Sequence, residues 1–276
     1  LIMIIWLASY PKSGNTWVRS FIASYIYSNN DFKFEDLANI ETFPGLNEIS
    51  FLREKFGNYK FTDMASYWHF FQTEINKRNK ISFLKTHNAL ITIKNFAFTD
   101  IVKTLGLIYI IRDPRDIIIS YSNHLNLSYE ETFKRMKDLN TVEKTNDQLD
   151  RTLLSSWPNH YNSWKYFPSN KLIVRYEDLV TNPLPSFSKI IKYLNKLYEL
   201  PISDEKIQSS IQNVEFEKLK KLEEKKGFSE NPNYDKGKFF FREGKINQWK
   251  EILSKDLLKQ IEEEFESEMV ENNYLS

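Results

Sequence analysis

The feature that most constrains the fold is a stretch near the N-terminus, IMIIWLASYPKSGNTWVRSFIASYI, at residues 2–26. Residues 2–8 are an unbroken apolar run rich in β-branched and aromatic side chains. The run is too short to cross a bilayer, and it predicts a strand buried on both faces. Residues 9–15 then supply turn chemistry with a proline, a glycine and an asparagine. From Thr16 onward apolar side chains recur at the spacing of an amphipathic helix.

A tight polar turn between a strand and a helix is suited to bind an anion. The free N–H groups of the turn and of the first helical turn converge, and the helix dipole favours negative charge there. Lys12 adds a positive charge, and Thr16 adds a hydroxyl. The commonest phosphate loop has its lysine directly after its second glycine, whereas this lysine precedes the only glycine. The stretch predicts a phosphate or sulfate site; the alternative is an ordinary strand–turn–helix with a solvated Lys12.

Length, charge and cysteine content narrow the class of protein. At 276 residues we expect one α/β domain over residues 1–276. The formal net charge of +1 creates no overall field for nucleic acid or anionic lipid, so an anion site must be local. The absence of cysteine excludes disulfides, thiolate metal ligands and a cysteine nucleophile. We find no signal peptide and no membrane span, and expect a soluble cytoplasmic protein.

A second apolar run, residues 81–84, predicts a buried strand that ends in Lys85-Thr86-His87. Open α/β sheets bind ligands beyond the carboxyl ends of their strands, which is where these side chains fall. The pKa of a histidine lies near working pH, so His87 is a candidate to remove a proton from an acceptor group. The alternative is a structural or surface histidine.

Residues 107–111 predict a third strand, followed by the sequence RDPRDIIIS. Asp113 with a proline after it is the signature of a helix N-cap and first turn. Arg112 then lies on the strand-to-helix loop, and Ser120 lies about two turns inside the helix. The planar donors of Arg112 are suited to grip a second phosphate. The alternative is that Arg112 only pairs with Asp113 or Asp116.

The rest of the chain is less specific. The patterns predict a fourth parallel strand at residues 172–176, a short helix at 95–103, helices at 183–199 and 204–213, and a terminal helix at 255–268. The aromatic-rich residues 31–79 predict short helices that form either core or one wall of an acceptor pocket.

Three other segments carry weaker expectations. We expect residues 129–144 to be helix and mobile loop near the acceptor entrance, and residues 227–241 to be an irregular, lid-like segment. A helical stripe in residues 153–166 favours core over substrate contact; its members are Trp157, His160, Tyr161 and Trp164.

Together these motifs resemble the sulfotransferases that use 3′-phosphoadenosine 5′-phosphosulfate (PAPS). The sequence SYPKSGNTW is similar to the family's 5′-phosphosulfate loop, and R-D-P-R-D-x-x-x-S to its 3′-phosphate motif, with K-T-H between them. Residues 242–250, REGKINQWK, approach the family's R-x-G-x-x-G-x-W-K element. Order and spacing agree along nearly the whole chain. The resemblance implies one three-layer α/β domain with a central, mostly parallel sheet and a P-loop-like strand–turn–helix at the phosphosulfate site.

The resemblance also implies roles in catalysis for three residues. Lys12 would contact the oxygen that bridges phosphate and sulfur, and neutralise the leaving phosphate. His87 would be the general base on the acceptor hydroxyl, and Lys85 would stabilise the sulfonyl group during transfer. The reaction would be direct in-line transfer without a metal or a covalent enzyme intermediate, and it would leave adenosine 3′,5′-bisphosphate (PAP).

The remaining roles implied by the resemblance concern the cofactor. Ser13, Gly14, Asn15 and Thr16 would hold the 5′-phosphate. Three aromatic side chains would contact the adenine, namely Trp17, Tyr176 and Phe216. Arg112 and Ser120 would bind the 3′-phosphate, and Arg242 and the backbone at Gly244 would close over it. Glu243, between these two, is also among the cofactor-binding positions.

The third motif departs from the family pattern. Glu243 stands where the family usually has lysine, which removes a positive charge near the 3′-phosphate. Asn247 and Gln248 replace a glycine and an aspartate, although asparagine tolerates the left-handed conformation. These changes leave open whether PAPS binding is weakened. The dimer motif that follows this segment in many cytosolic members is not kept, so the oligomeric state stays open.

We therefore expect a sulfotransferase that moves a sulfonyl group from PAPS to a hydroxyl or amine of a small-molecule or glycan acceptor. The alternative is a P-loop-like phosphotransferase (a kinase) or a nucleotide-binding protein without catalysis. A kinase should have a lysine after its second glycine and acidic residues that hold magnesium, and the sequence shows neither clearly. No motif names the acceptor.

Overall fold

A parallel sheet organises the computed structural model, which describes residues 2–28, 31–57, 60–144, 151–231 and 239–275. The sheet has five strands in the order β2–β3–β1–β6–β9, and each neighbouring pair is parallel. In chain order the strands are β1 (Ile4–Ser9), β2 (Ile40–Thr42), β3 (Ser82–Thr86), β6 (Thr104–Ile111) and β9 (Lys171–Arg175). Because β1 is central, the segments that follow β3, β1 and β6 come together at one edge of the sheet.

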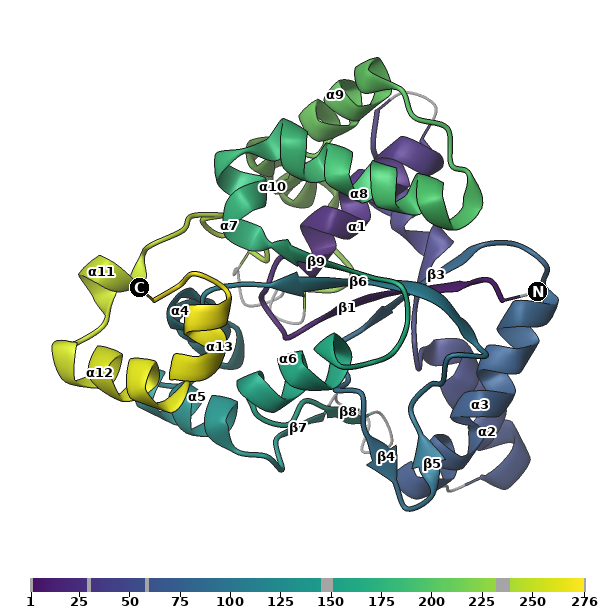
Figure 1. Cartoon of the computed structure of the whole chain (residues 1–276), viewed down its shortest axis with the longest axis horizontal. Helices are drawn as coiled ribbons and strands as arrows, with labels where there is room; N and C mark the ends of the chain where they lie inside the picture. The colour runs from purple at the N-terminus through teal and green to yellow at the C-terminus, as the bar shows by residue number, and fades with distance from the viewer. Residues whose placement is uncertain (1, 29–30, 58–59, 145–150, 232–238, 276) are drawn as a thin grey trace.

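Helices cover both faces of this sheet, which gives three layers (Figure 1). One face carries α1 (Asn15–Ile26), α7 (Tyr176–Thr181), α8 (Pro183–Tyr198), α9 (Asp204–Asn213) and α10 (Phe216–Lys226). The other face carries α2 (Leu46–Phe56), α3 (Phe61–Lys77), α4 (Pro114–Leu125), α5 (Tyr129–Lys137), α6 (Trp157–Lys165), α12 (Lys255–Glu264) and α13 (Glu266–Glu271). The short elements are η1 (Phe34–Asn39), α11 (Trp249–Ile252), β4 (Thr92–Ile93), β5 (Phe96–Ala97), β7 (Val142–Lys144) and β8 (Arg151–Leu153).

The central strand β1 is buried on both faces, as its apolar run predicts. Successive side chains of a strand point to opposite faces, so Ile4 and Trp6 pack in one hydrophobic core while Ile5 and Leu7 pack in the other. The predicted α/β fold with a mostly parallel sheet is therefore confirmed, as are the strands expected at residues 81–84, 107–111 and 172–176.

One predicted helix is wrong. Residues 95–103 form strand β5, which pairs with β4, followed by a turn. The Phe98 side chain is fully buried, and its ring lies 5.3 Å from the Trp6 ring. The Phe98 backbone is held by a bond from its N–H to the Ile91 carbonyl at 2.9 Å and by a bond from Gln72 Nε2 to its own carbonyl at 2.6 Å. These distant partners override the local helical spacing.

The other helical expectations agree with the structure. The helices expected at 183–199 and 204–213 are α8 and α9, and the terminal helix is divided into α12 and α13. Of residues 129–144, where we expect helix and mobile loop, the helix is α5, and the last residues form β7, which pairs with β8. The stripe on α6 is core, because all four members are buried: Trp157, His160, Tyr161 and Trp164.

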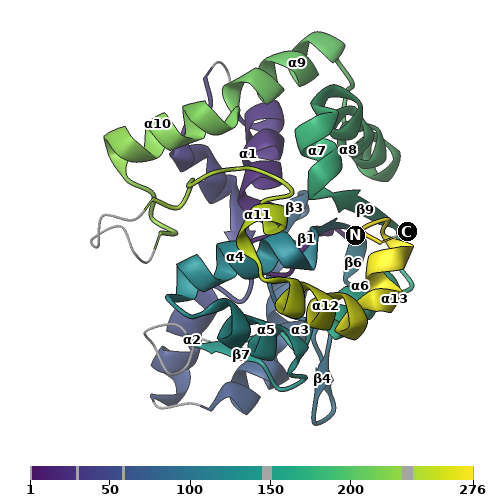
Figure 2. The ribbon, with the colours of Figure 1, turned by 90° about the vertical axis from the view of Figure 1, so that its left-hand side faces the viewer.

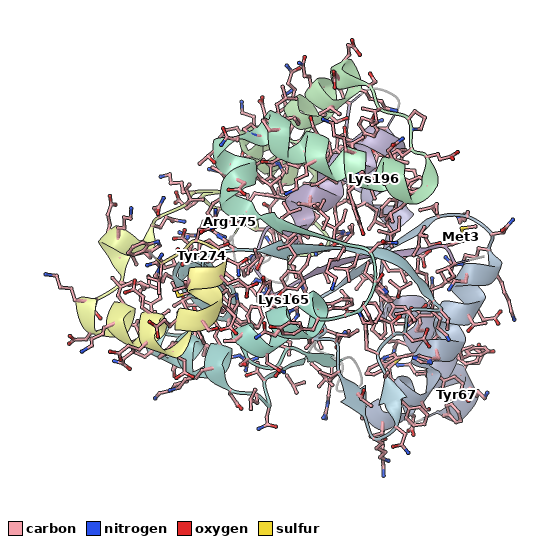
Figure 3. All side chains as sticks on the ribbon, in the orientation of Figure 1. Met3, Tyr67, Lys165, Arg175, Lys196 and Tyr274 are labelled. Carbon is pink, nitrogen blue, oxygen red and sulfur yellow. The ribbon has the colours of Figure 1, made fainter. Side chains whose placement is uncertain are left out.

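The chain's last described residues return to the edge of the sheet at β9. The Arg175 guanidinium lies 4.8 Å from the centre of the Tyr274 ring (Figure 3). Tyr274 Oη also donates to Glu177 on α7 at 2.9 Å. These contacts fasten α13 to the strand beside the predicted 3′-phosphate motif.

Candidate active site

The ends of three adjacent strands bring the predicted residues into one pocket with a volume of about 330 Å³. Lys12 follows β1, Lys85 and His87 lie at the end of β3, and Arg112 follows β6. All four line the pocket. So do Gly14, Asn15, Thr16, Trp17, Ser120, Tyr176, Phe216, Arg242, Glu243 and Gly244. Ser13 does not line it.

The turn after β1 has a backbone that suits an anion cradle. Lys12 has a φ of 65° and Gly14 a φ of 95°, and Gly14 is the N-cap of α1. Asn15 donates from Nδ2 to the Leu7 carbonyl at 3.1 Å, which fastens the turn to its own strand. Ser13 Oγ is buried and has no hydrogen-bond partner among the described residues. A buried hydroxyl without a partner is costly, but because Ser13 does not line the pocket, this hydroxyl is not placed to meet a ligand there.

Two glycines, one in this turn and one in the 242–250 segment, let aromatic rings pack closely against the backbone. A Cβ on Gly14 would lie 2.5 Å from Tyr176 Cδ2, and a Cβ on Gly244 would lie 2.4 Å from Phe216 Cδ2. Both glycines also have positive φ, which other residues rarely adopt. Tyr176 Oη donates to the Gly244 carbonyl at 3.0 Å, and Trp17 Nε1 donates to the Val214 carbonyl at 2.9 Å. The three rings expected against the adenine thus line one side of the pocket.

Lys12 is a cation in a poorly solvated place. Its ammonium lies 4.1 Å from the centre of the Phe240 ring. Burial, followed by the charge of Arg112, lowers the pKa of Lys12 from 10.5 to about 8. Because an anion would restore that pKa, the site is suited to a negatively charged ligand.

His87 is oriented by the end of β1. Its Nδ1 lies 2.8 Å from the Ser9 carbonyl oxygen and 3.3 Å from Ser9 Oγ. A carbonyl oxygen can only accept, so Nδ1 carries the proton and Nε2 is the basic nitrogen. Burial, followed by the charge of Lys85, lowers the pKa of His87 well below 6.5. The neutral imidazole is therefore the resting form, as a general base requires.

A buried pair behind His87 supports its backbone. His160 Nε2 donates to the His87 carbonyl at 3.0 Å, and Tyr109 Oη donates to His160 Nδ1 at 2.8 Å. Trp164 Nε1 and the Leu153 N–H bond to the next residue, Asn88, at its carbonyl and its side-chain oxygen, both at 2.9 Å. The core stripe on α6 thus also positions the loop that holds His87.

Arg112 joins two of the predicted motifs. Its Nη1 donates to the Lys12 carbonyl at 3.0 Å and its Nη2 to the Lys245 carbonyl at 2.9 Å. Its Nε is buried without a hydrogen-bond partner among the described residues. Asp113 is the N-cap of α4, as predicted, but the arginine that pairs with it is Arg115, at 2.7 Å. A guanidinium has five N–H donors, so these two hydrogen bonds leave others, Nε among them, for an anion.

The altered third motif keeps its backbone turn, which lies beside α4 (Figure 2). Asn247 has a φ of 61°, so asparagine takes the left-handed position that a glycine usually fills. Buried Asp116 accepts from the N–H groups of Asn247 at 2.7 Å and Trp249 at 3.2 Å. The Glu243 carboxylate lies 3.1 Å from Lys245 Nζ and 3.8 Å from Arg242 Nη1. Glu243 therefore partly neutralises the positive charge of Arg242 and Lys245.

Two carboxylates near the pocket were not anticipated. Glu223 on α10 is fully buried and accepts from Asn231 Nδ2 at 2.8 Å and from the N–H groups of Phe240 at 2.8 Å and Phe241 at 2.9 Å. Glu230 pairs with Arg19 and Lys85. In sequence Glu223 stands in a run of charged residues typical of a solvated surface, and Glu230 in an uncharged polar segment, so neither is marked as buried. Of the expected lid-like segment, residues 232–238 lie outside the described residues.

The remaining lining of the pocket is mixed in character. Its side chains come from β2, the loop after β3, α4 and the β7–β8 hairpin, and they are Thr42, Phe43, Pro44, Asn88, His124, Glu143, Arg151 and Thr152. Glu143 accepts from Tyr121 Oη. Within the described ranges, no three His, Asp or Glu side chains are close enough together to hold a metal ion, and no helix has the length and apolarity of a membrane span.

Comparison with known proteins now defines the class. The family model described as "Sulfotransferase domain" matches residues 4–273, so the chain belongs to the sulfotransferase family. The flavonol 3-sulfotransferase of Flaveria bidentis is 27% identical, over 94% of this chain and 79% of that protein. Cytosolic sulfotransferase 16 of Arabidopsis thaliana is 25% identical, over 93% of this chain and 73% of that protein.

Solved structures show the same fold. Mouse sulfotransferase SULT7A1, complexed with PAP, has a TM-score of 0.61 at 19% identity, with 98% of this chain and 85% of that chain covered. Retinol dehydratase, in a complex with retinol and PAP, also has a TM-score of 0.61, at 20% identity, with 96% of this chain and 81% of that chain covered.

Proposed function

We propose that this sulfotransferase transfers a sulfonyl group from PAPS to a hydroxyl or amine of a small-molecule acceptor. The observation that carries the proposal is the meeting of Lys12, His87 and Arg112 in one pocket from the ends of three adjacent strands. Membership of the family and the PAP bound to both structural relatives support it. A kinase is disfavoured, because the second anion-binding group fits a 3′-phosphate that ATP lacks.

The residues of this chain would hold the cofactor at both ends. The turn at residues 12–16 would bind the 5′-phosphate through its backbone N–H groups and the Thr16 hydroxyl. Arg112 and Ser120 would bind the 3′-phosphate, with Arg242 and the backbone around Glu243 and Gly244 beside it. The adenine would lie among the rings of Trp17, Tyr176 and Phe216. When bound, PAPS supplies an activated sulfonyl group.

The chain's own contribution to the chemistry would be positioning, proton transfer and charge stabilisation. His87 Nε2 would take the proton of the acceptor hydroxyl, while the bond from Nδ1 to the Ser9 carbonyl holds the ring in place. Lys12 would neutralise the negative charge that develops on the departing phosphate. Lys85 would stabilise the sulfonyl oxygens during transfer.

We propose that the acceptor lies against the residues from the end of β2, the loop after β3, α4 and the β7–β8 hairpin, which we call the acceptor wall. The composition of this wall favours a small molecule over a glycan chain. Phe43 and Pro44 contribute apolar surface, while Asn88, Glu143 and Thr152 contribute a few polar groups, which is typical of a small-molecule site. A flavonol is the acceptor in the name of one relative and is a reasonable first compound to test. A glycan acceptor stays the alternative. We also propose a cytoplasmic location, because two Arabidopsis relatives are named cytosolic sulfotransferases.

Two measurements test the proposal. PAP should raise the melting temperature far more than ATP with magnesium does, and the reverse order would contradict a PAPS site. Incubation of a library of phenols, alcohols, amines and oligosaccharides with PAPS should then give a sulfonated product by mass spectrometry. Binding of PAP without transfer to any compound would indicate a nucleotide-binding protein without catalysis.

A further inference from the structure

Glu230 reaches the pocket from the segment after α10, and two cations from distant parts of the chain meet it there. The Arg19 guanidinium pairs with both oxygens, Nη2 with Oε1 at 2.8 Å and Nη1 with Oε2 at 3.0 Å. Lys85 Nζ lies 3.4 Å from Oε2. Glu230 therefore connects the helix that follows the predicted phosphosulfate turn with the end of β3.

Arg19, Lys85 and Glu230 differ in the exposed fraction of their side chains. The Arg19 side chain is 2% exposed, whereas those of Lys85 and Glu230 are 14% and 28% exposed. Lys85 and Glu230 line the pocket, but Arg19 does not. Two parallel bonds from an arginine fix a carboxylate in both position and orientation. Arg19 is thus a rigid support, and Glu230 presents the anion that it fixes to Lys85.

The Glu230 carboxylate is the main charge that stabilises the Lys85 ammonium. Burial lowers the pKa of Lys85, and Glu230 is the largest influence that raises it again. The other charged or titratable groups that act on Lys85, or that it acts on, are Arg19, Glu143, His87 and His124. Although burial alone would raise the pKa of Glu230, Lys85 and Arg19 lower it to about 2, so Glu230 is ionised at working pH.

A lysine ammonium has three donors on a flexible stem, so it needs an external contact to fix its direction. We propose that Glu230, anchored by Arg19, is a positioning residue that orients the Lys85 ammonium toward the transferring sulfonyl group. One donor of Lys85 is held by Glu230, and the other two are left for sulfonyl oxygens. The inference depends on the proposed role of Lys85 in sulfonyl transfer.

The first test needs no acceptor. The titration of Lys85 is followed by NMR of lysine side chains, with the Lys85→Arg variant to assign its signal. In Glu230→Gln the midpoint should fall by about one pH unit or more, because the carboxylate no longer favours the ammonium. The matched control Glu224→Gln changes an exposed carboxylate on α10 and should leave the midpoint unchanged. An unchanged midpoint in Glu230→Gln would overturn the proposal.

The second test measures transfer. In Glu230→Gln the single-turnover rate constant should fall about tenfold, less than the roughly 100-fold expected for loss of a direct donor. PAP affinity should change less than about twofold, and Glu230→Asp should recover part of the rate. An unchanged rate, or a loss of PAP affinity as large as the loss of rate, would contradict a positioning role.

Two further comparisons separate an effect of Glu230→Gln on stability from an effect on function. Glu230→Gln leaves the buried Arg19 without its carboxylate, so the paired variant Arg19→Met with Glu230→Gln removes both charges together. Because Arg19 also lowers the pKa of Lys85, the paired variant should have a Lys85 midpoint between those of Glu230→Gln and the wild type. A paired midpoint above the wild-type value would overturn the proposal, because Arg19 rather than Glu230 would then dominate. If the wild type sulfonates nothing, the proposed function fails, while the titration still decides whether Glu230 holds the Lys85 ammonium.

Discussion

The pocket has two walls of different construction. The proposed cofactor wall, which includes Lys12, Trp17, Arg112 and Tyr176, stands on the ends of β1, β6 and β9. Arg112 joins β1 to the 242–250 segment by donating to the carbonyls of Lys12 and Lys245. The acceptor wall combines the end of β2 with α4 and the β7–β8 hairpin, which come from separate parts of the chain. A strand end fixes side chains more firmly than a short hairpin does. The difference indicates that the chemistry is set by the sheet, and the choice of acceptor by the shorter segments.

The largest expected effect on activity comes from substitution of His87, which follows β3. His87→Ala should lower kcat by about 10²- to 10⁴-fold, because it removes the proposed general base. PAP binding, measured by calorimetry, should stay within about twofold, since the cofactor wall is untouched. His69→Ala on α3 is the control and should leave kcat near the wild-type value. Turnover retained in His87→Ala would remove His87 from the mechanism.

The next largest effect should belong to the cofactor wall. Arg112→Ala should weaken PAP binding by about 10- to 100-fold, because it removes charge-assisted hydrogen bonds to a phosphate. Adenosine 5′-monophosphate, which has no 3′-phosphate, is the matched ligand and should bind both proteins with similar affinity. An equal loss for both ligands would show that Arg112 acts only by joining Lys12 to Lys245.

The pH dependence should also follow the cofactor wall. Because the pKa of Lys12 is lowered to about 8, its side chain carries a positive charge below pH 8 and loses that charge above it. We therefore expect kcat/KM for PAPS to fall above about pH 8, and Lys12→Arg to move that fall to higher pH. The pKa of His87 lies well below 6.5, so activity should persist to pH 6. A profile that declines through pH 7 toward acid would contradict a neutral resting His87.

A smaller effect is expected on the acceptor wall. Glu143→Gln should change KM for the acceptor by about 2- to 10-fold, because it alters one hydrogen-bonding group in the pocket. PAP affinity should not change measurably if the two walls are independent. A parallel loss of PAP affinity would show that Glu143, which is close enough to influence Lys12 and Lys85, belongs to both walls.

The smallest effect should come from restoring a residue of the family pattern. Glu243→Lys should strengthen PAP binding by about two- to fivefold, since an exposed ion pair contributes little. It also frees Lys245 and Arg242 from the carboxylate. Glu266→Lys, which makes the same charge change in α13 away from the pocket, is the control. Weaker PAP binding in Glu243→Lys would mean that Glu243 has a role of its own.

The sequence predicted the cofactor wall better than the acceptor wall for a physical reason. The turn at Lys12 and the N-cap at Asp113 depend on neighbouring residues, so local patterns indicate them. Asp116 and Glu230 act through partners more than 100 residues away, and a single sequence does not show such pairs. The wrong helix at residues 95–103 has the same cause, because Phe98 is placed by the distant core.

The most direct test of the account is a crystal structure of the protein with PAP. We expect the 5′-phosphate within hydrogen-bond distance of the backbone N–H groups of residues 12–16, and the 3′-phosphate within reach of Arg112 and Ser120. His87 Nε2 should face the position that the sulfonyl group would occupy. Phosphates bound anywhere else, or a nucleotide bound with its two ends reversed, would contradict the account.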